Sequence, residues 1–275
     1  MVKSVGNIRI TDRTLSCIDN LPHDKSDLLQ FLDFLIEMEI DTIELSERMR
    51  QLLSPLPVYQ FSLPHEKTRL EGLGDALCGD YLQTFAQAKK DFGEDIEFCP
   101  VNSFYCATAL AAEWVMSGGK NVASSFCGIG GFAATEELVM ILRMNGLRKA
   151  SKTYKFFPKM AKLFCKITGE NVRRDKPIVG ERIFNVESGV HVDGILKQPE
   201  RYEPFPPEIV GQKRKIVLGK QSGTASIRAK LSELDIQCVE EYIPHILELV
   251  KARALAKNGA ISEREFAEIA KECLA

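Results

Sequence analysis

The chain of 275 residues lacks several features that mark special classes of protein. It contains no apolar run long enough to span a bilayer, and its first residues lack the apolar core of a signal peptide. Its net charge of -2 gives no electrostatic reason to bind nucleic acid or an anionic membrane. We therefore expect a cytoplasmic protein with neither a membrane nor a nucleic acid as its partner.

The eight cysteines also lack a recognisable arrangement. None of them forms a C-x-x-C pair, and the chain is too long for a small secreted domain held together by disulfides. We expect most of these residues to be buried free thiols, which pack as small apolar groups.

The residues that are present favour an ordinary globular α/β protein. Alternating or short apolar runs predict five strands, at Val5–Asp12, Asp41–Ser46, Pro57–Leu63, Asp95–Cys99 and Asn121–Cys127. Apolar residues at helical spacing predict helices at Ser26–Met38, Tyr81–Asp91, Ala107–Met116 and Thr135–Met144. Because strands and helices alternate, the expected sheet is parallel.

The pattern changes after residue 150. The segment 149–162 is basic and aromatic and predicts a linker with a first helix, and residues 180–211 are rich in turns. Two amphipathic helices are expected at Val239–Ala256 and Ser262–Leu274. Ser262 with Glu265 three residues later is the pattern of a capping box at the start of the second helix.

Four short motifs carry a family resemblance. They are Ser188-Gly-Val-His-Val-Asp-Gly-Ile-Leu-Lys197, Tyr202-Glu203, Pro207-Glu-Ile-Val-Gly211 and Gly219-Lys-Gln-Ser-Gly223. In order and spacing they resemble the region that follows the barrel in the homocitrate synthase and isopropylmalate synthase family, and the nitrogen-fixation homocitrate synthases above all. The resemblance implies a metal-bearing TIM barrel that condenses an acyl-CoA with a 2-oxo acid.

The resemblance also implies a shortened barrel. A complete (β/α)8 barrel needs eight strand–helix units, whereas five strands are predicted here. We expect a TIM-barrel-like domain over residues 1–148, a linker and first C-terminal subdomain over 149–220, and a helical subdomain over 221–275. The gap is expected to be covered by another chain, by an insertion that the pattern hides, or by a rearranged sheet, because exposed strand edges invite association.

The family's metal-binding motifs are altered. The resemblance assigns Asp12, Thr14 and Asn102 to retained positions, here predicted to bind substrate, whereas Ser16 stands in the place of an arginine that stabilises an enolate. Cys17 and Cys99 stand where metal ligands are expected, and further changes follow at Val101 and after Gly130. We therefore predict that the family's divalent metal (Mg²⁺, Mn²⁺ or Zn²⁺) is not bound, and the sequence predicts no other specific cofactor.

Two interpretations of the cysteines are possible. Cys17 and Cys99, together with Cys127 at the end of the last predicted strand, could form a thiolate site for a soft metal. Alternatively, cysteine is a small filler in place of ligands that are no longer needed.

The C-terminal side keeps its family residues. His191 and Tyr202 match the histidine and tyrosine that assist deprotonation, in trans, within a dimer of the family. This pattern favours a non-catalytic or partner-dependent subunit, as a homodimer or with a full-length or complementary synthase chain. Two alternatives are an active acyltransferase with a rebuilt site and a module that binds an acyl-CoA or a 2-oxo acid without turnover.

Overall fold

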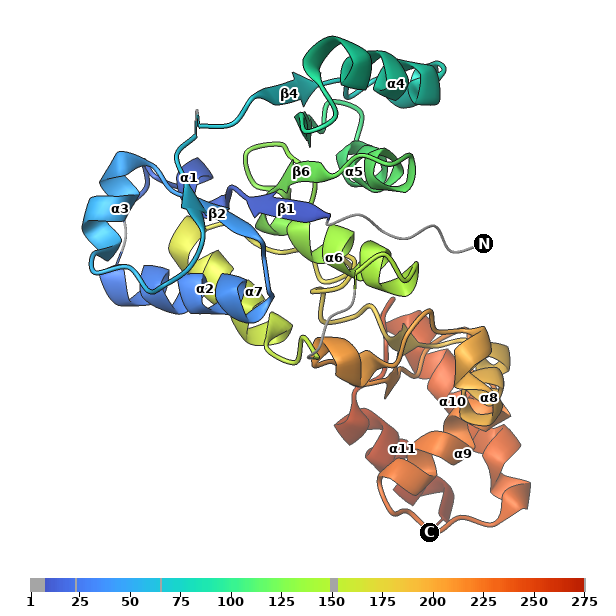
Figure 1. Ribbon diagram of the computed structural model, residues 1–275. Coiled ribbons are helices and arrows are strands. Elements are labelled where there is room, and N and C mark those ends of the chain that lie inside the picture. Colours follow the sequence, from blue (N-terminus) through green and yellow to red (C-terminus); the bar gives the residue numbers. More distant parts are fainter. Residues whose placement is uncertain (1–7, 23, 65, 149–152, 275) are drawn as a thin grey trace. The chain divides into compact units, whose positions relative to one another are not determined.

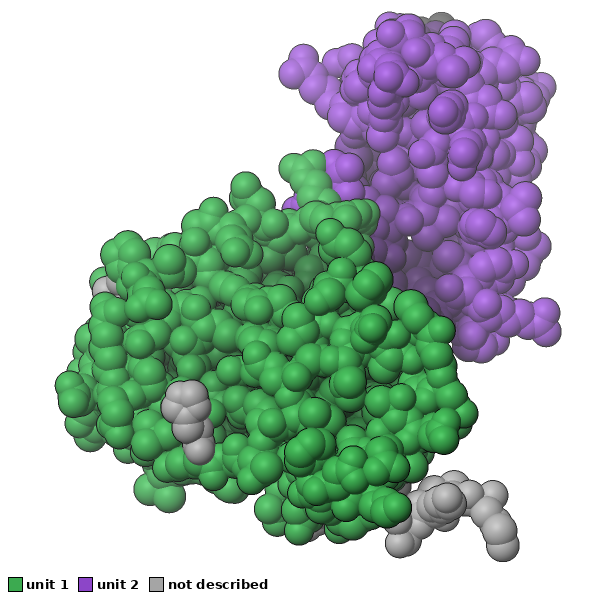
Figure 2. Space-filling view, turned by 90° about the horizontal axis from the view of Figure 1, so that it is seen from above, with its two compact units in different colours: residues 1–180 green, residues 181–275 purple. Residues whose placement is uncertain are grey.

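The chain divides into two units. The computed structural model describes residues 8–22, 24–64, 66–148 and 153–274. Unit 1 ends at Gly180 and unit 2 begins at Glu181 (Figure 2). The expected boundary at residue 148 therefore falls inside unit 1, because helix α7 (Phe157–Thr168) belongs to it. Among the described residues, no helix is both long and apolar enough to cross a membrane.

Unit 1 alternates strands with helices, as predicted (Figure 1). Its strands are β1 (Arg9–Asp12), β2 (Thr42–Glu44), β3 (Phe61–Ser62), β4 (Arg69–Gly72), β5 (Glu97–Pro100) and β6 (Asn121–Ser124). Its other helices are α1 (Thr14–Cys17), α2 (Lys25–Glu37), α3 (Glu47–Leu53), α4 (Tyr81–Phe92), α5 (Ala107–Met116) and α6 (Thr135–Met144), with short 3-10 turns η1 (Ala76–Cys78) and η2 (Phe126–Gly128). The strand β4 is an addition to the five that the sequence predicts.

All six strands form one parallel sheet in the order β3-β2-β1-β6-β5-β4. The central pair aligns Arg9 with Asn121 and Asp12 with Ser124. The last predicted strand ends three residues early, because η2 begins there and Cys127 has a left-handed backbone with φ 56°. Since the strands are parallel, their carboxyl ends meet at one edge of the sheet.

The sheet must be strongly curved. Its two edge strands, β3 and β4, are joined by residues 63–68 alone, which can span about 25 Å when extended. A flat sheet would put these strands about 24 Å apart sideways, and the connection would also have to run back along the strand length. An ion pair of 2.7 Å between Glu44 on β2 and Arg69 on β4 crosses the concave face directly. The architecture is compatible with part of a TIM-like barrel, in which β3 and β4 do not pair with each other.

Helices on the outside of the sheet build the core of unit 1. The predicted apolar face of α2 is buried, and the Asp24 carboxylate caps this helix by accepting hydrogen bonds from the amides of Ser26 and Asp27. Phe31 of α2 packs edge-on against Phe126, which packs in turn against Phe164 of α7. A second aromatic group joins α4, β5 and α5.

Unit 2 is a small helical unit with a two-stranded parallel sheet. Its elements are β7 (Asn185–Val186), α8 (Gly189–Lys197), η3 (Pro199–Arg201), η4 (Pro207–Val210), β8 (Lys215–Ile216), α9 (Thr224–Glu233), η5 (Glu240–Tyr242), α10 (Ile243–Ala256) and α11 (Glu263–Leu274). A separate apolar core joins α9, α10 and α11. The predicted capping box is confirmed, because the amide of Glu265 donates to the Ser262 hydroxyl and the Glu265 carboxylate accepts from the Ser262 amide.

The indole of Trp114 sets a packing constraint that can be tested. It is fully buried and donates a hydrogen bond of 2.9 Å from its Nε1 to the carbonyl of Asn121. A Cβ at Gly119 would lie 2.2 Å from that nitrogen. We expect Gly119→Ala to lower the free energy of unfolding by about 1–3 kcal/mol through overpacking, as measured by urea denaturation followed by circular dichroism.

Gly79→Ala is the matched control, because a Cβ there meets no atom within 4 Å. We expect it to change the free energy of unfolding by less than about 0.5 kcal/mol. Equal effects of the two substitutions would contradict this account of Gly119.

Candidate functional site

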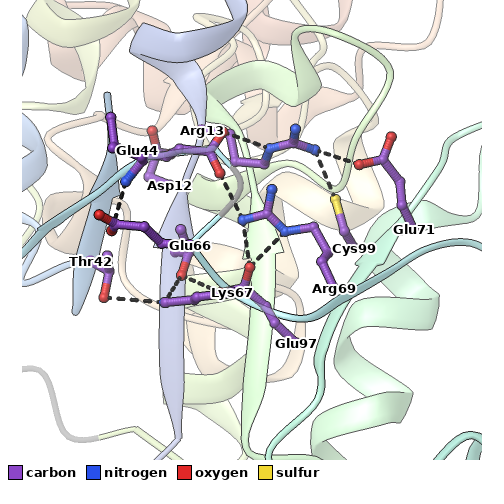
Figure 3. A network of polar contacts seen from close by, with 12 residues as sticks. Asp12, Arg13, Thr42, Glu44, Glu66, Lys67, Arg69, Glu71, Glu97 and Cys99 are labelled. Atoms are coloured by element: carbon purple, nitrogen blue, oxygen red, sulfur yellow. Dashed lines mark hydrogen bonds and ion pairs between the residues drawn. The ribbon is translucent and has the colours of Figure 1, made fainter. Parts of the chain in front are cut away.

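A network of charged side chains lies on the concave face of the sheet and runs from the amino ends of β4 and β5 to the carboxyl ends of β1 and β2 (Figure 3). Its cations are Arg13, Lys67 and Arg69, and its anions are Glu44, Glu71 and Glu97. Arg13 directly follows β1, Lys67 lies in the loop before β4, and the other residues lie on β2, β4 and β5. The three positive and three negative charges balance, as a largely buried network requires.

Arg69 is the centre of the buried half of this network. Its guanidinium lies 2.7 Å from Glu44 and 2.5 Å from Glu97, and the two carboxylates are 0% and 1% exposed. Lys67 adds an ion pair of 3.1 Å to Glu97 and donates a hydrogen bond of 2.8 Å to the hydroxyl of Thr11 on β1. These cations hold the pKa of Glu97 below its usual value against the opposing effect of burial, so that the carboxylate stays ionised.

Arg13 organises the outer half of the network, at the carboxyl end of β1. Its guanidinium pairs with Glu44 at 3.1 Å and with Glu71 at 3.0 Å. It also donates a hydrogen bond of 3.2 Å to the Cys99 sulfur. Phe132 covers it, with the ring centroid 4.2 Å from the guanidinium carbon, in the geometry of a cation–π contact.

The cysteines at the expected metal positions are protonated thiols beside this guanidinium. Burial raises the pKa of Cys99 to about 11 and that of Cys17 to about 12, although the positive charge of Arg13 opposes both shifts. A divalent ion at Cys99 would need a thiolate and would meet the charge of Arg13 directly. These residues therefore do not fit Mg²⁺, Mn²⁺ or Zn²⁺.

The alternative thiolate site finds no support in this geometry. Cys127 lies beside Glu136 and Lys176, and burial raises the pKa of its thiol far above the usual range. Across the residues that the structure describes, no group of three His, Cys, Asp or Glu side chains is placed to hold a metal ion.

The three predicted substrate-binding residues make hydrogen bonds within the protein. Asp12 is fully buried and accepts from the Thr135 hydroxyl at 2.6 Å and from the amide of Thr14 at 2.9 Å. The Thr14 hydroxyl accepts from the amide of Phe126, and the Asn102 side chain accepts from the amide of Ala107 at the start of α5. These bonds connect the strand ends to the loops that follow them, and a role in substrate binding stays a prediction.

His191 and Tyr202 are neighbours within unit 2. Their ring centroids lie 5.8 Å apart with the planes inclined at 58°, and the two side chains are exposed. Tyr202 rests against α8 at Gly194, where a Cβ would lie 2.3 Å from the phenol carbon that bears the hydroxyl. The sequence thus identified two residues that the fold brings together.

The sequence patterns did not predict this charged network. The available signal was the alternation Arg69-Leu-Glu71, in which two charged residues flank one apolar residue, as in a strand with one polar face. Nothing local indicated that this polar face would point inward.

The parallel sheet with outer helices and the separate small helical unit define a mixed α/β protein, compatible with part of a TIM-like barrel, with a separate C-terminal unit. The family described as "Homocitrate synthase post-HMGL domain-like" matches residues 178–258. The chain belongs to the homocitrate synthase and 2-isopropylmalate synthase family, as the motifs predict.

Named relatives support this assignment. The chain is 33% identical over 184 residues to "Homocitrate synthase, omega subunit" of Clostridium pasteurianum, covering 67% of this chain and 52% of that protein. It is 35% identical over 212 residues to homocitrate synthase AksA of Methanocaldococcus jannaschii, covering 76% of this chain and 47% of that protein. A 2-isopropylmalate synthase of the same organism is 41% identical over 155 residues, or 55% of this chain and 30% of that protein. The chain spans about half the length of the homocitrate synthases that it matches.

The buried network makes a prediction about stability. Arg69→Met would leave the carboxylates of Glu44 and Glu97 without their shared cation in a buried place. We expect it to lower the free energy of unfolding by about 3–5 kcal/mol, as measured by urea denaturation. Arg264→Met, which breaks the exposed pair of Arg264 with Glu268, is the control and should cost less than about 0.5 kcal/mol.

The buried carboxyl of Asp12 makes a prediction about pH. Burial raises its pKa to about 6 from an ordinary value of 3.8. The folded state therefore binds the proton more tightly than the unfolded state, so this contribution to stability is complete below pH 3.8 and is lost as the pH rises through about 6. We expect the unfolding free energy of Asp12→Asn to rise by about 2–3 kcal/mol relative to the wild type between pH 4 and pH 7.

The control is Asp33→Asn, which removes an exposed carboxylate on α2. Its difference from the wild type should stay constant over the same pH range in denaturation experiments at fixed ionic strength. A constant difference for Asp12→Asn as well would show that this carboxyl has no raised pKa in the folded state.

Proposed function

We propose that this chain is a non-catalytic, partner-dependent subunit of an enzyme that condenses an acyl-CoA with a 2-oxo acid. The observation that carries the proposal is the contact of Arg13 with Cys99 and two carboxylates at the mouth of the sheet. The guanidinium of Arg13 already binds the sulfur lone pair and the two carboxylates that a divalent ion would need as ligands there. The chain by itself then lacks the electrophile that holds a 2-oxo acid in this chemistry.

The exposed pair in unit 2 supports a role beside a partner. His191 is an exposed imidazole, and an imidazole can accept a proton near neutral pH. Tyr202, held beside it at Gly194, can orient a reacting group. We infer that these two side chains act at the metal site of a partner chain. The name "omega subunit" of the Clostridium pasteurianum relative agrees with an enzyme of several subunits.

The two free edges of the sheet offer a place for that partner. The carbonyls of Gln60 and Ser62 accept from β2, so the backbone groups of Phe61 point away from it. The carbonyls of Thr68 and Gly72 accept hydrogen bonds from the amides of Glu97 and Val101. The backbone groups of Arg69 and Glu71 therefore point away from β5. We infer that a complementary family chain adds parallel strands here, which is one of the three outcomes expected for the gap.

Activity measurements on the separate and combined chains test this function. We expect the chain alone to release no free CoA from acetyl-CoA with 2-oxoglutarate or 2-oxoisovalerate, and the complex with the complementary synthase chain of the same organism to be active. His191→Ala in the complex should lower kcat about 10²-fold, since a general base contributes at least this much. His245→Ala, at an exposed histidine of α10, should leave the rate unchanged.

Hydrogen exchange tests the docking edges. We expect the amides of Phe61, Arg69 and Glu71 to exchange rapidly in the isolated chain and at least about tenfold more slowly in the complex, because new strands would accept their hydrogen bonds. The amides of Glu97 and Val101 donate within the sheet and serve as internal controls that stay slow in both states. A complex that leaves the three edge amides unchanged would rule out these edges, and turnover by the isolated chain would overturn the proposed function.

A further inference from the structure

Unit 2 contains an open cleft that neither its helical core nor the His191–Tyr202 pair uses. The cleft has a volume of about 820 Å³ and lies between β8, α9 and the first turn of α11. Its floor is apolar, with Ile216, Leu218 and Phe266 among the lining residues. Charged side chains also line the cleft, so its lining has an apolar part and a charged part.

The charges around the cleft are mainly positive. Four cations line it, namely Arg182, Lys215, Lys230 and Arg264, against the two carboxylates of Glu181 and Glu263. Lys230 and Arg264 also pair with Glu233 and Glu268 outside the lining, so the positive charge available to a ligand is mainly that of Arg182 and Lys215. A local excess of one sign in a concave site attracts ligands of the opposite sign.

Lys230 is a buried cation at this cleft. The residue is 2% exposed, and its ammonium lies 2.6 Å from a Glu233 oxygen and 3.6 Å from a Glu263 oxygen. The two carboxylates balance the charge of Lys230, but among the described residues its three N–H groups make no well-directed hydrogen bond. Because an ammonium has three donors, an N–H group of Lys230 is still available to an oxygen of a ligand.

Two further cations of the cleft have no partner of their own. Within the described ranges, no ion pair or side-chain hydrogen bond engages Arg182 or Lys215. Their neighbours differ, since Arg214 pairs with Glu203 at 2.6 Å and Arg264 pairs with Glu268 at 3.1 Å. Lys215 is held in β8, where its amide donates to the carbonyl of Phe184, two residues from Arg182.

We propose that this cleft binds a small organic anion that bears two or more carboxylate or phosphate groups next to an apolar portion. The guanidinium of Arg182 suits a planar carboxylate or a phosphate because it offers two parallel N–H donors. Lys215 supplies a second charge from β8, and Lys230 supplies a buried donor from α9. The apolar floor takes the carbon skeleton, and the proposal does not depend on the function proposed above.

Calorimetric titration of the full chain tests this site, with citrate and with pyrophosphate as the probes. The ionic strength is held constant with sodium chloride, so that general screening does not imitate binding. We expect saturable one-to-one binding of at least one probe, and the two titrations distinguish a carboxylate site from a phosphate site. Arg182→Gln and Lys215→Gln should each weaken the binding about tenfold, since each removes one charge-assisted contact.

Lys213→Gln is the matched control, because Lys213 is an exposed lysine two residues before Lys215 that does not line the cleft. It should change the affinity less than twofold. Unchanged melting temperatures of the three variants would show that the losses come from the site and not from unfolding. Amide chemical shifts in the wild type should move at residues 215–218 and 261–264.

Several results would overturn the proposal. One is that neither probe binds saturably up to 10 mM. Another is that Arg182→Gln, Lys215→Gln and Lys213→Gln have equal affinities. A third is that the amide chemical shifts move only outside residues 215–218 and 261–264. Lys230→Met adds an independent check, because it removes the buried donors while keeping an unbranched side chain that is one atom shorter. If it folds and binds as tightly as the wild type, the buried ammonium has no part in a ligand site.

Discussion

The ion pairs of Arg69 with Glu44 and Glu97 hold together a sheet whose described edge strands, β3 and β4, do not pair with each other. In a complete barrel, the hydrogen bonds between the first and last strands fix the curvature. Here residues of β2, β4 and β5 meet across the interior, and Lys67 from the short connection between the edge strands joins them. Ion pairs between side chains thus help to fix the curvature of this sheet, as backbone hydrogen bonds do in a closed barrel.

The same network explains why the mouth of the sheet is unsuited to a metal. Arg13 is needed there as the counter-charge of Glu44 and Glu71. Once this cation is in place, the thiol of Cys99 is a hydrogen-bond acceptor and no longer a candidate ligand. Arg13, which disfavours a metal here, and Arg69, which joins the strands across the concave face, both pair with Glu44. The altered motif after the first strand and the curvature of the sheet therefore depend on the same network of charges.

The sequence predicted the parts of the fold that follow local rules. The α/β class, the strands around Asp12, Glu44 and Cys99, and the Ser262 capping box all rest on periodicity or on contacts within a few residues. Strand β4 was not predicted because its inward face carries the charged residues Arg69 and Glu71, whereas strands of a parallel sheet are usually apolar. The partners of those charges lie on β1, β2 and β5, so no local pattern could reveal them.

The candidate functional residues also differ in whether a local sequence motif could predict them. The pair of His191 and Tyr202 was found through a motif, because both residues lie within one short segment around α8. The charged network and the cleft around Lys230 depend on residues from several elements. Such sites become visible only when the tertiary structure brings those elements together.

The central place of β1 in the sheet also has a consequence for the nascent polypeptide. One neighbour of this strand, β6, is synthesised more than a hundred residues later, and the amide of Phe126 reaches back over 112 positions to the Thr14 hydroxyl. While the ribosome is still translating the first half, the emerging β1 has one unsatisfied flank and an unburied Asp12. This stretch is therefore where molecular chaperones would have most to protect during biosynthesis.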